Sequence, residues 1–305
     1  MTAIFNQSLT MRLARSSARG CSMPPTIAGD SCRASHPTGI DTMATGNLSK
    51  CLPVSLAYEG GWSDNKKDPG GATMKGITLG TFRRYKPGAS KTQLRNISQT
   101  DVEFIYRDGF WTPIRGDDLP FGVDLATMDY GINSGPSRAV RDLQRVVGVA
   151  ADGKVGAGTL KALILADKKK TIQKFCAKRL SFMQGLKIWN TFKRGWSARV
   201  ADVEAKAVAM WLANSGTSPA SRKIELDVEA DKAAGKAKTQ TNGAGGAVAG
   251  GTGASGTDAV MNSGPNWWLI GVIAAVVVVV VVVCLVKANQ HKQRAAAYKS
   301  VAAAV

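Results

Sequence analysis

The sequence predicts a mainly helical protein with a small glycine-rich loop and strand region, followed by a transmembrane helix near the C-terminus. Apolar side chains recur at helical spacing through much of residues 46–213. Glycines are concentrated between Gly60 and Gly76, where a loop and a few short strands are expected around residues 62–78. Residues 267–286 contain no charged side chain and are long enough to cross a bilayer.

Proline, glycine and capping residues mark where the helices of the middle segment begin and end. Pro53 suits the first turn of a helix that ends before Gly60, and Thr100 with Glu103 matches a capping box. Further helices are expected from Pro120 towards Ile132, from Pro136, near 159–165, at about 169–189 and at 197–212.

Residues 267–286 form an uncharged run that includes eight consecutive valines, Val276–Val283. As a helix the run spans about 30 Å, the thickness of the hydrocarbon core of a bilayer. Trp267 and Trp268 stand at one end and a basic tail, residues 287–305, follows at the other, as at the ends of a transmembrane helix. A buried core helix or an aggregation-prone strand is the alternative, because valine is a poor helix former.

The positive-inside rule predicts a single-pass inner-membrane protein with a cytoplasmic tail and a periplasmic preceding domain. No export signal is evident, so the alternative is that the domain stays inside until lysis. Residues 214–266 are rich in Gly and Ala and are expected to be a flexible linker. Residues 1–45 are expected to be a disordered extension, either transit-like or upstream of a natural start at Met43, which we favour.

Positive charge is concentrated in the middle of the chain. Of the formal net charge of +18, residues 43–220 contribute 27 basic against 15 acidic side chains, a net of +12. An excess of this size favours a polyanionic partner. The basic residues are not interleaved with aromatic ones and no nucleic-acid-binding motif is present, so nucleic acid is not expected to be that partner.

The placement of histidine and cysteine excludes several mechanisms. His36 and His291 lie outside residues 43–220, and the five cysteines are widely spaced with no CxxC pair. A Ser-His-Asp triad, a Cys-His pair, a His-containing zinc site and a disulfide framework are therefore not expected in this segment. We expect no cofactor and no metal, so acid and base chemistry falls to carboxylates.

Only three glutamates occur between residues 43 and 220. Glu103 is explained by the predicted capping box, and Glu204 fits a solvated helix face beside Lys206. Glu59 ends an apolar helix and is followed by two glycines and Trp62. Apolar surroundings raise the pKa of a carboxyl group, which suits a general acid for a glycosidic bond. The alternative is an ordinary exposed glutamate at a helix end.

The run from Glu59 to Thr78, EGGWSDNKKDPGGATMKGIT, resembles the EGG-x-DPGG-x-T-x-x-GIT signature of glycoside hydrolase family 108, the bacterial and phage muramidases. Later segments resemble the same family, namely DYGINSGP at 129–136 with Leu143-Gln144, the Asp152-Gly153 to Thr159-Leu160 segment, and Gly195-Trp196 with Arg199-Val200. The resemblance covers about residues 46–213. It implies a lysozyme-like helical catalytic region at 46–135 and a helical peptidoglycan-binding region at 136–213.

The resemblance also implies the chemistry. Glu59 would be the general acid that cleaves the β-1,4 bond between N-acetylmuramic acid and N-acetylglucosamine in peptidoglycan. By similarity to the Glu/Asp/Thr order of helical phage lysozymes, Asp68 would steady the oxocarbenium charge or orient the water, and Thr73 would help to hold that water. Asp68 also suits a turn, and Asp64 is the competing second carboxylate.

Four residues are candidates for sugar contacts: Trp111, Tyr130, Asn133 and Ser134. Aromatic faces stack on pyranose rings and amides bond N-acetyl groups. Asn133 ranks above the two aromatic residues, because Trp and Tyr at helix ends are more often part of the core.

The leading interpretation is therefore a membrane-tethered N-acetylmuramidase of the lysozyme type that serves lysis or wall remodelling, as in a prophage endolysin. A non-catalytic peptidoglycan anchor that uses the same groove is one alternative. In another, the valine-rich helix disrupts the membrane as a holin does. One general acid serves a hydrolase and a lytic transglycosylase alike, so both products remain open.

Overall fold

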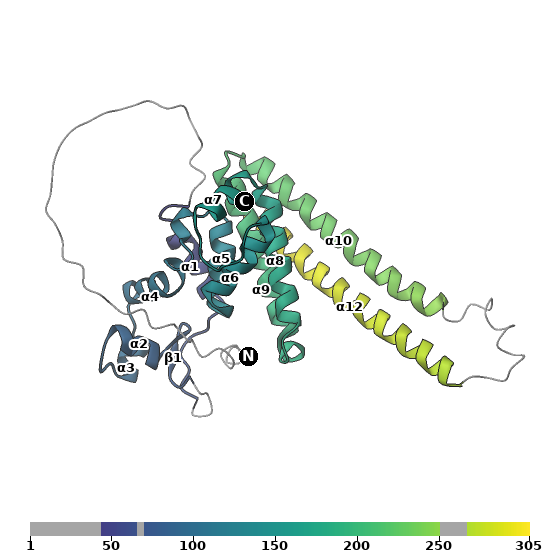
Figure 1. Ribbon diagram of the computed structural model, residues 1–305, viewed down its shortest axis with the longest axis horizontal. Coiled ribbons are helices and arrows are strands. Elements are labelled where there is room, and N and C mark those ends of the chain that lie inside the picture. The colour runs from purple at the N-terminus through teal and green to yellow at the C-terminus, as the bar shows by residue number, and fades with distance from the viewer. Residues whose placement is uncertain (1–43, 66–69, 251–266) are drawn as a thin grey trace, which may run out of the picture. The chain divides into compact units, whose positions relative to one another are not determined.

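The computed structural model describes residues 44–65, 70–250 and 267–305, and these are mainly helical (Figure 1). The predicted fold class is confirmed. The chain divides into two compact units, of which the first ends at Ile164 and the second begins at Leu165. The sequence placed a boundary at 135/136 instead, whereas helices α5 and α6 on either side of it pack together within the first unit.

The first unit contains short helices, one hairpin and two irregular helical turns. Its elements in order are α1 (Leu48–Leu56), β1 (Thr73–Met74), β2 (Ile77–Thr78), α2 (Leu79–Tyr85), α3 (Lys91–Arg95), α4 (Gln99–Tyr106), a π-helical turn (Arg107–Trp111), a 3-10 turn (Gly116–Asp118), α5 (Val123–Ser134), α6 (Pro136–Val147) and α7 (Ala157–Leu165). Pro136 occupies the first turn of α6, as predicted.

Two local predictions about this unit are wrong. Ser98, not Thr100, is the N-cap of α4, since its extended backbone lets its hydroxyl accept a hydrogen bond from the amide of Asp101. Glu103 instead accepts a hydrogen bond from the side chain of Gln99 on the exposed face of α4. Pro53 lies inside α1 rather than in its first turn, because the helix begins at Leu48.

The N-terminal boundary also differs from the expected one. Residues 1–43 lie outside the described residues, so the predicted extension stays a prediction there. Ala44 is buried, and its amide donates to the carbonyl of Leu119 at 3.0 Å. Residues 44 and 45 therefore belong to the folded first unit rather than to the extension.

Helix α5 is the core of the first unit, with every residue from Val123 to Gly131 buried. It is joined to α1 by Asp124, whose carboxylate accepts hydrogen bonds from the side chain of Asn47 at 2.6 Å and from the amide of Leu125 at 2.7 Å. The thiol of Cys51 lies 3.6 Å from the same carboxylate. Burial raises the pKa of Asp124 to about 6, although these hydrogen bonds oppose the rise.

The described residues of the second unit form four long helices: α8 (Lys168–Gln184), α9 (Trp189–Asn214), α10 (Pro219–Gly250) and α12 (Trp267–Ala303). Helices α10 and α12 lie side by side as the two long helices of Figure 1 and are in extensive contact. Helix α12 also packs against α9, and α9 packs against α8. Alanines from α10 and from the second half of α12 are buried in this unit.

Helix α10 occupies much of the segment that the sequence predicts to be a flexible linker. Alanine and lysine are strong helix formers, and the alanines at 230, 233 and 237 are buried in the second unit. Tertiary packing thus offsets the helix-breaking tendency of the glycines. Residues 251–266 of the predicted linker lie outside the described residues.

The predicted basic tail, residues 287–305, is also helical, because its residues up to Ala303 continue α12. Arg294 donates to the carboxylate of Glu204 on α9 at 2.6 Å, and the hydroxyl of Tyr298 donates to the same oxygen at 2.9 Å. Arg294 also lies 3.7 Å from Glu229 of α10. We call Glu204, Arg294, Tyr298 and Glu229 the polar cluster of the second unit.

Glu204 was expected on a solvated face, and this prediction is wrong. Its carboxylate is buried, and burial raises its pKa although Arg294 and Tyr298 oppose the rise. The partners come from a helix 90 residues later in the chain, so the local pattern around Glu204 carried no sign of them.

One helix among the described residues is long and apolar enough to cross a membrane, at Gly271–Ala303, with an 18-residue window of mean hydropathy 3.0. The side chains of its valine run are largely exposed, including Val278 at 60% and Val279 at 61%. This observation supports membrane association by length and composition.

Asp124 makes the stability of the first unit depend on pH. Its folded-state pKa of about 6 lies above its ordinary value of 3.8, so the folded state binds the extra proton and loses stability as the pH rises through this window. The expected loss is about 3 kcal/mol for this group. Asp124→Asn should remove it, so the variant gains relative to the parent protein between about pH 4 and pH 7. Urea unfolding of both proteins measures the difference, and a difference independent of pH contradicts the assignment.

Candidate active site

A β-hairpin with a two-residue turn lies at the candidate site. Strands β1 and β2 pair in antiparallel register, and the turn between them is Lys75-Gly76. Both turn residues have positive φ, 49° and 75°, as a type I′ turn requires. Ser63 extends the pairing through two backbone hydrogen bonds with Thr73, of 2.9 and 2.8 Å. The strands expected around residues 62–78 are therefore present.

Glu59 lies against this turn. It follows α1 by three residues, its amide donates to the carbonyl of Leu56 at 3.0 Å, and its side chain is half-buried. A Cβ atom added to Gly76 would lie 3.0 Å from Oε2 of Glu59 and 2.7 Å from the hydroxyl oxygen of Tyr106. The absence of a side chain at Gly76 therefore allows the carboxylate and the tyrosine to approach the turn together.

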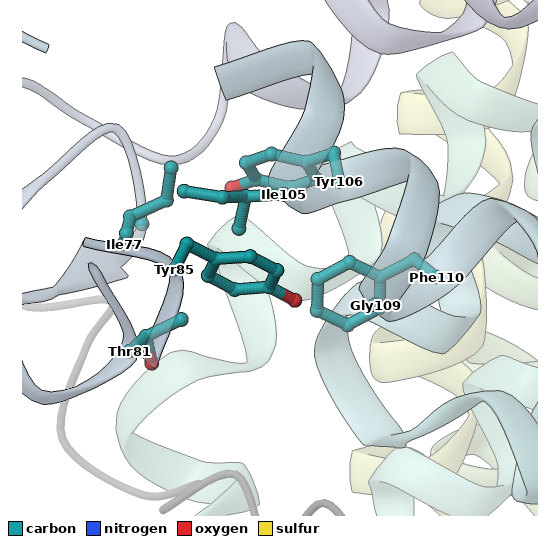
Figure 2. A pocket seen from close by; sticks show the side chains of 8 residues that line it. Ile77, Thr81, Tyr85, Ile105, Tyr106, Gly109 and Phe110 are labelled. Carbon is teal, nitrogen blue, oxygen red and sulfur yellow. The ribbon is translucent and has the colours of Figure 1, made fainter. Parts of the chain in front are cut away.

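A small pocket opens beside the same turn (Figure 2). Gly76 and Ile77 of the hairpin, Tyr85 of α2, and Tyr106 and Phe110 are among the residues that line it. Figure 2 shows the ring of Tyr85 pointing towards Phe110. The walls are mainly apolar and aromatic, so the turn that supports Glu59 is packed against a largely apolar region.

The hydroxyl of Tyr85 donates to the carboxylate of Asp108 at 2.6 Å. Burial and this hydrogen bond raise the pKa of Tyr85 to about 12. Tyr85 therefore stays protonated at neutral pH and acts here as a hydrogen-bond donor.

Thr73 is in the hairpin but is buried, with 2% of its surface exposed, and its hydroxyl donates to the carbonyl of Gly71 at 3.0 Å. Asp68 lies outside the described residues. Asp64 forms an exposed ion pair with Lys91 of α3 at 3.0 Å. The structure thus brings Glu59 and Thr73 to the same hairpin and places Asp64 in contact with a cation on the surface.

Two of the predicted sugar contacts are core residues, which corrects the expectation from sequence. Trp111 is 1% exposed, packs against Gly116 and has no hydrogen-bond partner for Nε1 among the described residues. Tyr130 is fully buried, and its hydroxyl donates to Asp142 of α6 at 2.7 Å. Neither ring presents a face to solvent on which a sugar can stack.

Asn133 and Ser134 are half-buried in the last turn of α5. The side chains that begin α1 and α5 are joined by the hydrogen bond between Asn47 and Asp124. Glu59 follows the C-terminal end of α1, and Asn133 lies in the last turn of α5. The two helices are in contact. Asn133 and Ser134 remain the candidates for a polar contact with substrate.

The later signature segments have a structural role that the sequence did not indicate. The side-chain amide of Gln144 donates to Asp152, to the carbonyl of Lys154 and to Thr159, at 2.7, 2.9 and 3.1 Å. Its oxygen accepts from the amide of Gly153 at 2.9 Å. Gln144 thereby holds the loop between α6 and α7 through direct hydrogen bonds to Asp152 and Gly153.

Tyr106 was missed by the sequence reasoning. Its only local signal is an aromatic residue at the end of a helix, which is also typical of core positions.

Among the described residues, no three His, Cys, Asp or Glu side chains gather in a way that would hold a metal ion.

Comparison with known proteins finds similarity over the part of the chain that contains the candidate site. The family described as glycosyl hydrolase 108 matches residues 52–135, a range that contains Glu59, the hairpin and Asn133. Among solved structures, the chain is similar to that of Brucella abortus SagA, with 43% sequence identity and a TM-score of 0.50 over 54% of this chain and 96% of that one. No curated protein matches the chain.

Gly76→Ala tests the close approach at the turn. The added methyl group would meet Glu59 and Tyr106 and would also strain a backbone with φ of +75°, so the activity against peptidoglycan should fall by about tenfold or more. Gly88→Ala is the matched control, because Gly88 has a similar positive φ of +77° but no atom of the described residues lies within 4 Å of its added Cβ. A turbidity assay on cell walls compares the two variants, and equal activities contradict a role for the space at Gly76.

Proposed function

Because this chain belongs to glycosyl hydrolase family 108, we propose that it is an N-acetylmuramidase in which Glu59 is the general acid. Family membership makes it a glycoside hydrolase with a lysozyme-like action on peptidoglycan. The proposal adds the bond, the β-1,4 linkage between N-acetylmuramic acid and N-acetylglucosamine, and the residue that protonates its oxygen. The observation that carries it is the close approach of Glu59 to the Lys75-Gly76 turn.

The position of Glu59 suits a proton donor. A general acid must be within hydrogen-bond reach of the glycosidic oxygen, and its carboxyl must be held in one orientation. Glu59 is half-buried, follows the end of α1 and rests on a turn with no side chain at Gly76. Contact with the turn limits the rotamers that the Glu59 side chain can adopt.

Asp68 is proposed as the second carboxylate. It belongs to the segment between Ser63 and Thr73, and the two hydrogen bonds between these residues close that segment at its base. The base is continuous with the hairpin on which Glu59 rests. In this proposal Asp68 stabilises the positive charge that develops on the sugar, and Thr73 supports the loop and its water.

Asn133 and Ser134 are proposed to bind the sugar. Both are polar, half-buried and placed at the C-terminal end of α5, which is in contact with the helix that precedes Glu59. The net charge of +12 on residues 43–220 favours approach to a wall rich in carboxylates and phosphates.

We also propose that residues 267–286 tether the enzyme to a membrane. Support comes from their mean hydropathy and from the exposure of the valine side chains. A periplasmic catalytic unit with a cytoplasmic tail requires that Arg294 and Tyr298 leave Glu204, since a tail across the bilayer cannot remain packed on α9. Protease treatment of a C-terminal tag in spheroplasts decides this orientation, because only a cytoplasmic tag is protected.

Glu59→Gln tests the proposed acid. The amide cannot donate the proton, so the rate of glycan cleavage should fall by at least about 100-fold while peptidoglycan binding is retained. Glu103→Gln is the matched control, because Glu103 lies exposed on α4, where its carboxylate accepts a hydrogen bond from Gln99. Mass analysis of the products measures cleavage and separates hydrolysed from anhydro sugars.

Retention of activity in Glu59→Gln would remove Glu59 from the mechanism. A parent protein that binds peptidoglycan but releases no fragment would identify the chain as a non-catalytic anchor.

Paired aspartates at exposed valines test the tether. Val278→Asp with Val279→Asp should release the chain from membranes, because each charge at the centre of a span costs about 2.5 to 3.5 kcal/mol. Lys299→Asp with Ser300→Asp is the control, at exposed positions of the same helix outside the apolar run. Alkaline carbonate extraction measures release, and membrane retention of the valine variant rules out the proposed span.

A further inference from the structure

Tyr106 ends α4 and is followed at once by a π-helical turn. The amide of Thr112 donates to the carbonyl of Arg107, five residues earlier, at 2.8 Å. Turns of this kind are rare in proteins, and those that are found frequently lie at functional sites. Here the turn brings Phe110 against Tyr106, with ring centroids 5.4 Å apart, and both rings are buried. The side chain of Tyr106 is therefore held firmly by the core of the first unit.

The hydroxyl of Tyr106 donates to the carbonyl of Lys75 at 2.8 Å. Lys75 is the first residue of the hairpin turn and has a left-handed backbone, φ 49°, which costs a residue other than glycine roughly 1 kcal/mol or more. The strand register pairs Met74 with Ile77 and does not use the carbonyl of Lys75. The hydrogen bond from Tyr106 thus gives the carbonyl of Lys75 a partner that the strand pairing does not provide, and it connects the turn to α4.

The same hydroxyl and the carboxylate of Glu59 both crowd Gly76. Their oxygens lie 2.7 and 3.0 Å from the position of a Cβ atom at Gly76. Gly76 is therefore in contact with Glu59, the proposed acid, while Lys75 accepts the hydrogen bond from Tyr106. A shift of the turn would displace the surface on which the carboxylate rests.

We propose that Tyr106 is a positioning residue for glycoside cleavage, which fixes the Lys75-Gly76 turn beneath Glu59. This inference rests on the proposed role of Glu59 as the acid. Tyr106 itself is buried and acts through the turn rather than on the sugar. Because a displacement of about 1 Å at a reacting group can cost about 100-fold in rate, a single hydrogen bond to the turn has a measurable effect on catalysis.

Tyr106→Phe removes the hydroxyl and keeps the ring packed against Phe110. The expected result is a fall in kcat of about tenfold or more with KM within about threefold, because Glu59 is displaced while the sugar contacts are kept. The alkaline limb of the pH profile of kcat, where a general acid loses its proton, should also shift, since the surroundings of the Glu59 carboxyl are changed. Full-length protein in mild detergent and soluble glycan fragments serve for both measurements.

Tyr85→Phe is the matched control. Tyr85 lines the same pocket, but its hydroxyl donates to Asp108 rather than to Lys75, so its loss should leave kcat close to that of the parent protein. Circular dichroism must show native helix content in both variants. Equal losses in the two variants, or an unchanged kcat in Tyr106→Phe, would overturn the inference.

Lys75→Asn supplies a second, independent readout. It places the Asn-Gly pair that type I′ turns prefer at a position with positive φ. Added to Tyr106→Phe, it should restore a substantial part of kcat, since the turn is then favoured without the tyrosine bond. No recovery in a folded double variant counts against the turn as the route. If Tyr106→Phe alone does not fold, the double variant is compared directly with Tyr85→Phe.

The same assay distinguishes this inference from the proposed function. A dead Glu59→Gln with a fully active Tyr106→Phe rejects only the role of Tyr106. An active Glu59→Gln rejects the proposed acid and with it the inference.

Discussion

The carboxylate of Glu59 and the hydroxyl of Tyr106 approach one glycine, and the candidate site depends on the space that this glycine leaves. Gly76 must provide both a left-handed backbone for a two-residue turn and the absence of a Cβ atom. Any other residue would be strained and would also displace the proposed acid. At least one glycine of the signature, Gly76, therefore has a steric reason to be glycine, because Glu59 and Tyr106 both contact the turn that contains it.

The second unit depends on a different interaction, the burial of Glu204 against Arg294 and Tyr298. Breaking such a pair leaves a buried carboxylate without a cation, at a cost of about 3 to 5 kcal/mol. The second half of α12 is thereby held on α9, while its first half exposes valines. One helix therefore combines a packed polar half with an apolar half suited to lipid, and any topology that separates them must offset the loss of the polar cluster.

Sequence reasoning was most successful where the chemistry is local. Helical spacing, the helix start at Pro136 and the position of Glu59 before two glycines were all visible in short windows. It was wrong where partners are distant. Glu204 has the local sequence pattern of a surface residue but forms an ion pair with Arg294 of another helix. Trp111 and Tyr130 are of the residue types that contact sugars, but both are buried. Alanine-rich α10 was expected to be a coil, because the sequence does not show that α12 packs along it.

The sequence by itself determined the mainly helical class, the resemblance to a glycoside hydrolase family, the apolar run and Glu59 as the one glutamate with a candidate role in acid catalysis. These follow from residue type and spacing, which act over a few turns of chain. Only the tertiary structure decided that Gly76 and Tyr106 support Glu59, that Gln144 holds the following loop, and that the basic tail packs on the second unit. These contacts join residues between 8 and 94 positions apart, and burial is what gives each of them its energetic weight.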